Sequence, residues 1–163
     1  MGRRNIEMGE NFTGVNNRKL TRLAAVVVLV SAAVVAAASA ADLALVQPRE
    51  LTAQLAGKGP RPAVFMVGPN VLYRSKHIPG SVYAGPGNSE AGLAMLKVEA
   101  GKLPRDREVV VYCGCCPWDR CPNVKPAVDL LKRMGFAKAK ALYLPTGFKA
   151  DWLDQGYAAD AGR

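Results

Sequence analysis

Two short, uninterrupted apolar runs constrain the fold more than any other feature of this sequence. Ala63–Val67 stands between Pro62 and Gly68, and the β-branched and aromatic run Val109–Tyr112 leads directly into Cys113. Runs of this length without polar alternation are typical of strands that are buried on both faces of a parallel sheet. The sequence therefore predicts a sheet whose two faces are both covered by other elements.

The segments around these runs have the patterns of helices and shorter strands. Ser89 is predicted to cap a helix that packs against the sheet. Its expected inward-facing residues, which recur at helical spacing, are Ala91, Ala94, Met95 and Val98. The other predicted elements are helices over about 48–55 and 126–135 and short strands at 43–46, 82–84 and 141–144. Strands that alternate with helices form parallel βαβ units, so the predicted fold class is α/β, with one domain over residues 43–160.

The first forty residues have the pattern of an export signal. Basic residues within 18–22 precede an uncharged stretch over residues 23–41, which contains the small residues Ala38-Ser39-Ala40. We expect a signal peptide over residues 1–40, removed near Ala41, or else an uncleaved membrane anchor, because the stretch is about long enough to cross a bilayer. In both cases the domain is expected outside the cytoplasmic membrane, in the periplasm if the cell is Gram-negative.

The net charge gives more support to small anions than to nucleic acid as ligands. The chain carries a formal charge of +9, and residues 1–40 hold five of its 22 basic and two of its 13 acidic residues, which leaves +6 on the remainder. The basic residues are scattered singly, with no basic run interleaved with aromatic residues, so nucleic-acid binding has little support. The charge fits an anion-binding protein, although solubility alone explains it as well.

All four cysteines stand within nine positions, and they make this segment the chemical centre of the chain. Cys113, Cys115, Cys116 and Cys121 lie too close in sequence to join distant parts of a fold by disulfides. Cys113 follows a predicted strand and precedes a helix, whose first N–H groups are expected to lower the pKa of its thiol. In parallel sheets, ligands bind beyond the carboxyl ends of the strands. Cys113 is therefore the predicted nucleophile.

Spacing weighs against two other uses of these cysteines and leaves a third open. No cysteine stands six residues before Arg120, as the Cys-x5-Arg motif of cysteine-dependent phosphatases requires. A zinc site is disfavoured because four cysteines in one loop do not form two separated cysteine pairs, and no cofactor is predicted. A disulfide between Cys121 and another cysteine stays open, because an exported protein meets an oxidising compartment.

Three motifs, in this order along the chain, resemble the rhodanese family of sulfurtransferases. They are Tyr73 followed by His77-Ile78-Pro79-Gly80-Ser81, the apolar strand that ends in Tyr112-Cys113, and Gly135-Phe136 followed by Leu144, Gly147-Phe148 and Trp152. The resemblance covers about residues 45–157. It implies a three-layer α/β fold with a central, mainly parallel sheet flanked by helices, in which Cys113 carries the transferred sulfur. His77, the only histidine, belongs to a turn motif and is expected to be structural.

The resemblance implies an exported sulfurtransferase that works by a ping-pong reaction. The Cys113 thiolate takes sulfane sulfur from an anionic donor such as thiosulfate, holds it as a persulfide and passes it to a thiol or another thiophilic acceptor. Cys115, which has Cys-x4-Arg spacing to Arg120, is the second candidate nucleophile or a resolving thiol, and Cys121 is a further possible resolving thiol. The expected substrate-binding residues are Gly114, Cys116, Trp118 and Arg120.

Two departures from the family pattern keep other functions open. Met66 and Gly68 stand where the family often has Asp-x-Arg, and the loop after Cys113 is longer than in the family. These departures favour a non-catalytic module that binds sulfur or an anion on the same fold. The clustered cysteines favour instead a thiol–disulfide redox protein.

Overall fold

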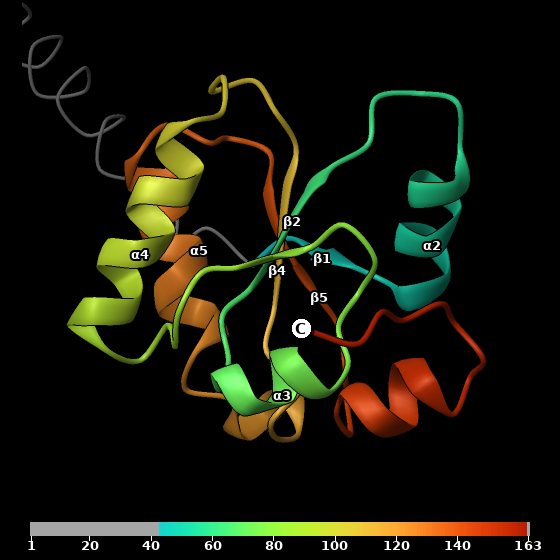
Figure 1. The fold of residues 1–163 in the computed structure, drawn as a ribbon. Helices are drawn as coiled ribbons and strands as arrows, with labels where there is room; N and C mark the ends of the chain where they lie inside the picture. Colours follow the sequence, from blue (N-terminus) through green and yellow to red (C-terminus); the bar gives the residue numbers. More distant parts are fainter. Residues whose placement is uncertain (1–42, 163) are drawn as a thin grey trace, which may run out of the picture. The chain divides into compact units, whose positions relative to one another are not determined.

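The computed structural model describes residues 43–162, which form a sheet with helices around it (Figure 1). The elements, in chain order, are β1 (Leu45–Val46), α2 (Pro48–Ala56), β2 (Ala63–Met66), α3 (Asn70–Ser75), β3 (Val82–Tyr83), α4 (Glu90–Gly101), β4 (Val109–Tyr112), the 3-10 turn η1 (Trp118–Arg120), α5 (Val124–Arg133), β5 (Ala139–Leu142) and the π-helical turn η2 (Lys149–Leu153).

Every strand pair within the described residues is parallel. The order across the five-stranded sheet is β1-β5-β4-β2-β3, with β4 at its centre. Met66 at the end of β2 lies opposite Tyr112 at the end of β4. Because the two strands end in register, the residues that follow them share one edge of the sheet. The predicted α/β class and parallel sheet are confirmed.

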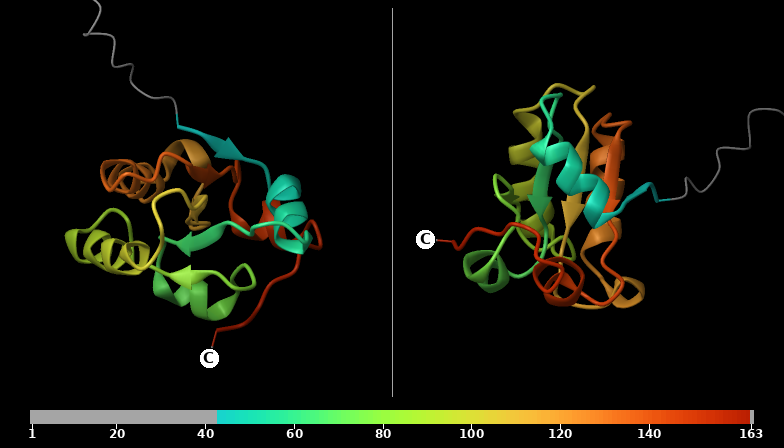
Figure 2. Two further views of the ribbon diagram at one scale, coloured as in Figure 1. Left: turned by 90° about the horizontal axis from the view of Figure 1, so that it is seen from above. Right: turned by 90° about the vertical axis from the view of Figure 1, so that its right-hand side faces the viewer.

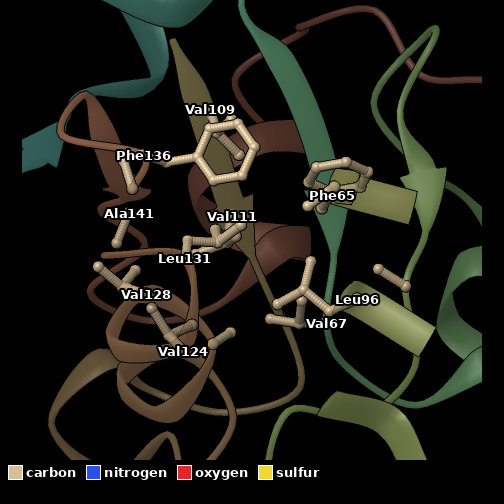
Figure 3. Close-up of a cluster of buried hydrophobic side chains, with 14 of the residues drawn as sticks. Phe65, Val67, Leu96, Val109, Val111, Val124, Val128, Leu131, Phe136 and Ala141 are labelled. Carbon is tan, nitrogen blue, oxygen red and sulfur yellow. The ribbon is translucent and has the colours of Figure 1, made fainter. Parts of the chain in front are cut away.

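Successive side chains of β4 point to opposite faces of the sheet and belong to two separate hydrophobic cores. Val109 and Val111 pack with α4 and α5, in the cluster drawn in Figure 3. Val110 and Tyr112 pack on the other face, in a cluster that includes Trp152 of η2. The view from above in Figure 2 shows α4 and α5 on one side of the strands and α2 on the other. The sheet is therefore the middle of the three layers that the family resemblance implied.

The predicted inner face of α4 is wrong. Met95 and Val98 are 44% and 63% exposed, and the buried residues of the helix are instead Gly92, Leu96 and Ala100. The helix approaches the preceding loop so closely that a Cβ at Gly92 would stand 2.0 Å from the Pro86 carbonyl oxygen. The inner face was missed because two of its three residues are too small to stand out as apolar. The predicted cap is present, since the Ser89 side chain accepts a hydrogen bond from the Gly92 N–H at 3.1 Å.

The other corrections concern boundaries. The last strand covers Ala139–Leu142 rather than 141–144, and it includes Lys140, whose Nζ lies 3.0 Å from Glu108 Oε1. Helix α5 begins at Val124, two residues before the predicted start at Pro126. Helix α3 was not predicted, and it buries no residue completely, so it leaves no apolar period in the sequence.

The predicted export signal over residues 1–40 lies outside the described residues, as does its expected cleavage point at Ala41. Between residues 43 and 162, no helix is both long and apolar enough to cross a membrane.

Candidate active site

Cys113 stands directly after β4, and its side chain continues the alternation of that strand. It belongs to the core beside α5 and is only 2% exposed. The end of β2 lies against it, so that a Cβ at Gly68 would stand 2.8 Å from Cys113 Sγ and 2.9 Å from the Cys113 carbonyl oxygen. Position 68 admits only glycine in this arrangement. This is a physical reason for the missing arginine of the Asp-x-Arg pattern.

The loop after Cys113 returns two further thiols to it. The Sγ atoms of Cys113, Cys115 and Cys121 all lie within 4.8 Å of one another, and we call these three residues the thiol cluster. The shortest distance that the structure gives within it is 3.0 Å, between Cys113 Sγ and Cys115 Sγ. Cys115 is exposed and Cys121 is half-buried. The thiol cluster therefore extends from the core to the solvent.

Gly114 makes the tight turn that brings Cys115 back toward Cys113. Its φ of +78° lies in the left-handed region, which residues with a side chain rarely adopt. A Cβ at this position would also stand 2.4 Å from the Phe148 Cβ. Binding of the substrate anion by Gly114 stays a prediction, and the structure shows its conformational role.

Asn123 is the site residue that sequence analysis missed. Its buried amide donates from Nδ2 to Cys113 Sγ at 3.3 Å and to Cys115 Sγ at 3.7 Å. Its Oδ1 accepts the Asn88 backbone N–H at 3.1 Å, which fixes the orientation of the amide. Asn123 precedes α5, but its side chain caps no N–H of that helix. Its position two residues after Cys121 was the only signal in the sequence.

The order of thiol acidity differs from the prediction. The pKa of Cys113 is raised, first by its interaction with Cys121 and then by burial and by Cys115. The pKa of Cys121 is lowered, first by the Cys113 thiol and further by the backbone N–H groups of Asn123 and Val124 at the start of α5. The helix N-terminus therefore stabilises a thiolate as expected, but at Cys121. The prediction of a lowered pKa for Cys113 is wrong because the longer loop places Cys121 next to the helix.

The remaining predicted site residues surround the thiol cluster unevenly. Cys116 Sγ lies 3.1 Å from Cys115 Sγ and 3.8 Å from the Arg120 carbonyl oxygen. Burial and the neighbouring thiols raise the pKa of Cys116 to about 12. Trp118 is half-buried and packs edge-on against Tyr143, with ring centroids 5.5 Å apart. Arg120, at the end of η1, is exposed, so its guanidinium is available to an anion in solvent.

The histidine motif supports the end of β4 from the other face. The Tyr112 hydroxyl accepts the Ile78 N–H at 3.1 Å and lies 3.2 Å from Ser81 Oγ. His77 stacks on Tyr73 at 4.1 Å between ring centroids and bonds through Nδ1 to the Tyr73 carbonyl at 2.9 Å. These contacts give His77 the structural role expected from its turn motif. They also hold Tyr112, and with it the start of the cysteine loop.

The cavity at the cysteines is very small. It measures about 10 Å³ and is lined by Cys113, Cys116, Cys121, Gly114, Trp118, Val124, Leu142 and Leu144. A cavity of this size holds about one atom of the size of a water oxygen. A larger cavity of about 510 Å³ lies at the opposite edge of the sheet, at the amino ends of β2 and β4, where Arg61 and Arg107 line it. The small cavity, and not this larger one, adjoins the thiols.

The family is shown by comparison with known proteins. A family model described as Rhodanese-like domain matches residues 47–154, about two thirds of the chain. The chain therefore belongs to the rhodanese-like domain family, as its three motifs predicted. This membership supports a sulfurtransferase type of activity. Comparison with curated protein sequences gave no match.

Solved structures show the same fold at low sequence identity. The BH2092 protein of Bacillus halodurans superposes with a TM-score of 0.57 at 17% identity, covering 90% of this chain and 87% of that one. The Alr3790 protein of Anabaena sp. gives 0.55 at 20% identity, covering 72% and 92%. The single-domain sulfurtransferase RDL2 of Saccharomyces cerevisiae gives 0.52 at 18% identity, covering 72% and 94%. These similarities establish the fold alone. The chemistry has to be argued from the residues of this chain.

Proposed function

We propose that this domain is a sulfurtransferase that carries sulfane sulfur as a persulfide on Cys113. The observation that carries the proposal is the position of this thiol, at the carboxyl end of the central strand, with the exposed Cys115 thiol 3.0 Å away. The carboxyl ends of parallel strands are where ligands bind in such sheets. Membership of the rhodanese-like family supports the same chemistry.

The reaction is a transfer of one sulfur atom in two substitutions. A thiolate attacks the outer sulfur of a donor such as thiosulfate, a new S–S bond forms, and the donor's S–S bond breaks as sulfite leaves with the electron pair. A thiol or another thiophilic acceptor then attacks the outer sulfur of the persulfide and releases the cysteine thiolate. Arg120 is exposed beside the loop and would attract the donor anion.

Burial decides how the donor reaches the thiol cluster. Cys113 is 2% exposed, and the adjoining cavity of about 10 Å³ admits a single atom rather than a thiosulfate ion. We assign the first contact with the donor to the exposed Cys115. Attack by Cys113 on the outer sulfur of a Cys115 persulfide, across the 3.0 Å gap, then moves that sulfur into the core and frees the Cys115 thiolate.

Intact mass of the protein tests the proposal. The reduced, metal-free protein is incubated with thiosulfate and compared with Cys113→Ser, Cys115→Ser and Cys116→Ser. Wild type should gain the mass of one sulfur atom and hold it on Cys113. Cys113→Ser should gain it only on the exposed Cys115, where an added thiol removes it, and Cys115→Ser should gain it more slowly. Cys116→Ser, which changes a thiol outside the thiol cluster, is the control for general effects of a serine in the loop. A wild-type protein that gains no sulfur refutes the proposal.

A second candidate function is thiol–disulfide exchange, favoured by the 3.0 Å separation of the Cys113 and Cys115 sulfurs. In that case an oxidant removes two hydrogen atoms and forms one disulfide, and the protein loses their mass instead of gaining sulfur. Retention of sulfur without turnover in the presence of an acceptor would support a non-catalytic sulfur carrier.

We propose further that the domain works outside the cytoplasmic membrane. The support is the sequence pattern of residues 1–40. The mature N-terminus, determined on protein recovered from cell fractions, tests this. Cleavage near Ala41 indicates a signal peptide, an intact terminus in the membrane fraction indicates an anchor, and an intact terminus in the cytoplasm contradicts export.

A further inference from the structure

We propose that the thiol cluster is also a binding site for one soft, monovalent metal ion of the Cu(I) type, held by the sulfurs of Cys113, Cys115 and Cys121. These three Sγ atoms lie within 4.8 Å of one another. With metal–sulfur bonds of about 2.3 Å, three sulfurs around a trigonal ion stand about 4 Å apart. The three thiols are therefore already grouped, and binding must move the Cys113 and Cys115 sulfurs from 3.0 Å to about 4 Å apart.

The elements that carry the three sulfurs make this arrangement reproducible. Cys113 is anchored at the end of the central strand β4, and Cys121 stands three residues before α5 begins. Cys115 is joined to Cys113 through Gly114, whose positive φ makes the turn between them. One ligand thus comes from the sheet, one from the approach to a helix and one from the exposed side of the loop.

Hydrogen-bond donors already surround the sulfurs. The Asn123 amide donates to Cys113 at 3.3 Å and lies 3.7 Å from Cys115 Sγ. Such outer donors neutralise part of the charge of metal-bound thiolates and fix their orientation. Asn123 has a second contact, to Asn88, that holds its amide in the donating orientation.

The ligand set selects the kind of ion. Thiolates are soft ligands that favour Cu(I), zinc and iron–sulfur clusters over hard cations. A structural zinc site takes four protein ligands, and the Cys116 sulfur lies outside the group of three that approach one another within 4.8 Å. Three thiolates satisfy Cu(I), which accepts three-coordination. The sulfurs of Cys113, Cys115 and Cys121 meet in space, although the spacing of the cysteines along the chain is not that of two separated zinc-binding pairs.

Binding exchanges protons for the ion and involves no oxidation. Each of the three thiols loses its proton to solvent as its sulfur bonds to Cu(I). The bound ion would then occupy the thiolate lone pairs that attack a sulfane donor. Metal and persulfide therefore exclude each other. This inference does not depend on the proposed sulfur transfer, because copper binding is measured without a sulfur donor.

The test is a competition titration of the reduced full chain, without oxygen, using Cu(I) and the chromophoric chelator bicinchoninate. Wild type should remove one equivalent of Cu(I) from the chelator. Cys113→Ser, Cys115→Ser and Cys121→Ser should each weaken binding by more than the roughly 10- to 100-fold that loss of an outer hydrogen-bond partner costs at metal sites. Cys116→Ser is the matched control and should keep most of the affinity.

A second readout separates binding from folding. Cu(I) should raise the unfolding temperature of wild type and of Cys116→Ser, because a ligand of the folded state stabilises it by mass action. Far-UV circular dichroism of the metal-free variants shows whether each is folded. Cys115→Ser should disturb folding least, because Cys115 is exposed. Failure to compete with the chelator overturns the proposal. So does an equal loss of affinity in Cys116→Ser, or one equivalent of Zn²⁺ bound where Cu(I) is not.

Discussion

Replacing Asn123 by aspartate changes one polar atom at the centre of the site. Asn123→Asp keeps the shape of the side chain and the oxygen that accepts the Asn88 N–H, but it replaces the N–H donor at 3.3 Å from Cys113 Sγ by an acceptor. A hydrogen bond to a charged group contributes about 1.5–3 kcal/mol. If the thiolate form loses about 2 kcal/mol of stabilisation, the fraction of reactive thiolate falls roughly 30-fold.

The expected result is that Asn123→Asp loads sulfur from thiosulfate about 30-fold more slowly than wild type while remaining folded. Loading is followed by intact mass, and folding by urea denaturation. The control is Asn88→Ala, which leaves the donor to Cys113 in place and should load at nearly the wild-type rate. If Asn123→Asp loads as fast as wild type, the Asn123 amide does not stabilise the reactive sulfur.

Three further predictions concern the scaffold. Leu96→Ala, at a fully buried position, should lower the free energy of unfolding by about 2–5 kcal/mol, whereas Met95→Ala, at a position 44% exposed, should lower it by less than about 1 kcal/mol. Equal losses in urea denaturation would contradict the observed inner face of α4. Burial raises the pKa of Tyr112 to about 12 from 10.0, so the folded state favours the neutral phenol. This contribution to the free energy of unfolding is complete below pH 10 and declines by about 1.4 kcal/mol per pH unit up to about pH 12. Between pH 8 and 11.5, the free energy of unfolding should fall less steeply in Tyr112→Phe than in wild type, and parallel profiles would contradict this. Gly114→Ala should cost at least about 1–2 kcal/mol, since alanine is strained at positive φ and its Cβ would meet Phe148; a protein as stable as wild type in thermal unfolding would show that the turn can relax.

The sheet was predictable because its signal is local. Four consecutive apolar residues in β4 can be satisfied only when both faces of the strand are buried, and both faces of the observed strand are. The position of Cys113 at the carboxyl end of that strand followed directly from the strand assignment. The parallel order of the strands followed from the alternation with helices.

The acidity and accessibility of the thiols could not be predicted, because they depend on how a long loop folds back. Cys113 was expected next to the helix that would lower its pKa, but the loop contains η1 and brings Cys121 to that position instead. The contact of Asn123 with Cys113 joins residues ten positions apart. No periodicity records such a contact, and the same holds for the inner face of α4, where Gly92 packs by its lack of a side chain.

Because Gly68 lies so close to Cys113, the end of β2 and the cysteine loop depend on each other sterically. Restoring the arginine of the family pattern at position 68 would drive a side chain into the Cys113 sulfur, whose distance from a Cβ there is 2.8 Å. The end of β2 and the cysteine loop must therefore be swapped together when parts are exchanged with other members of the family. A graft of either segment alone should misfold the site, while a graft of both can preserve it.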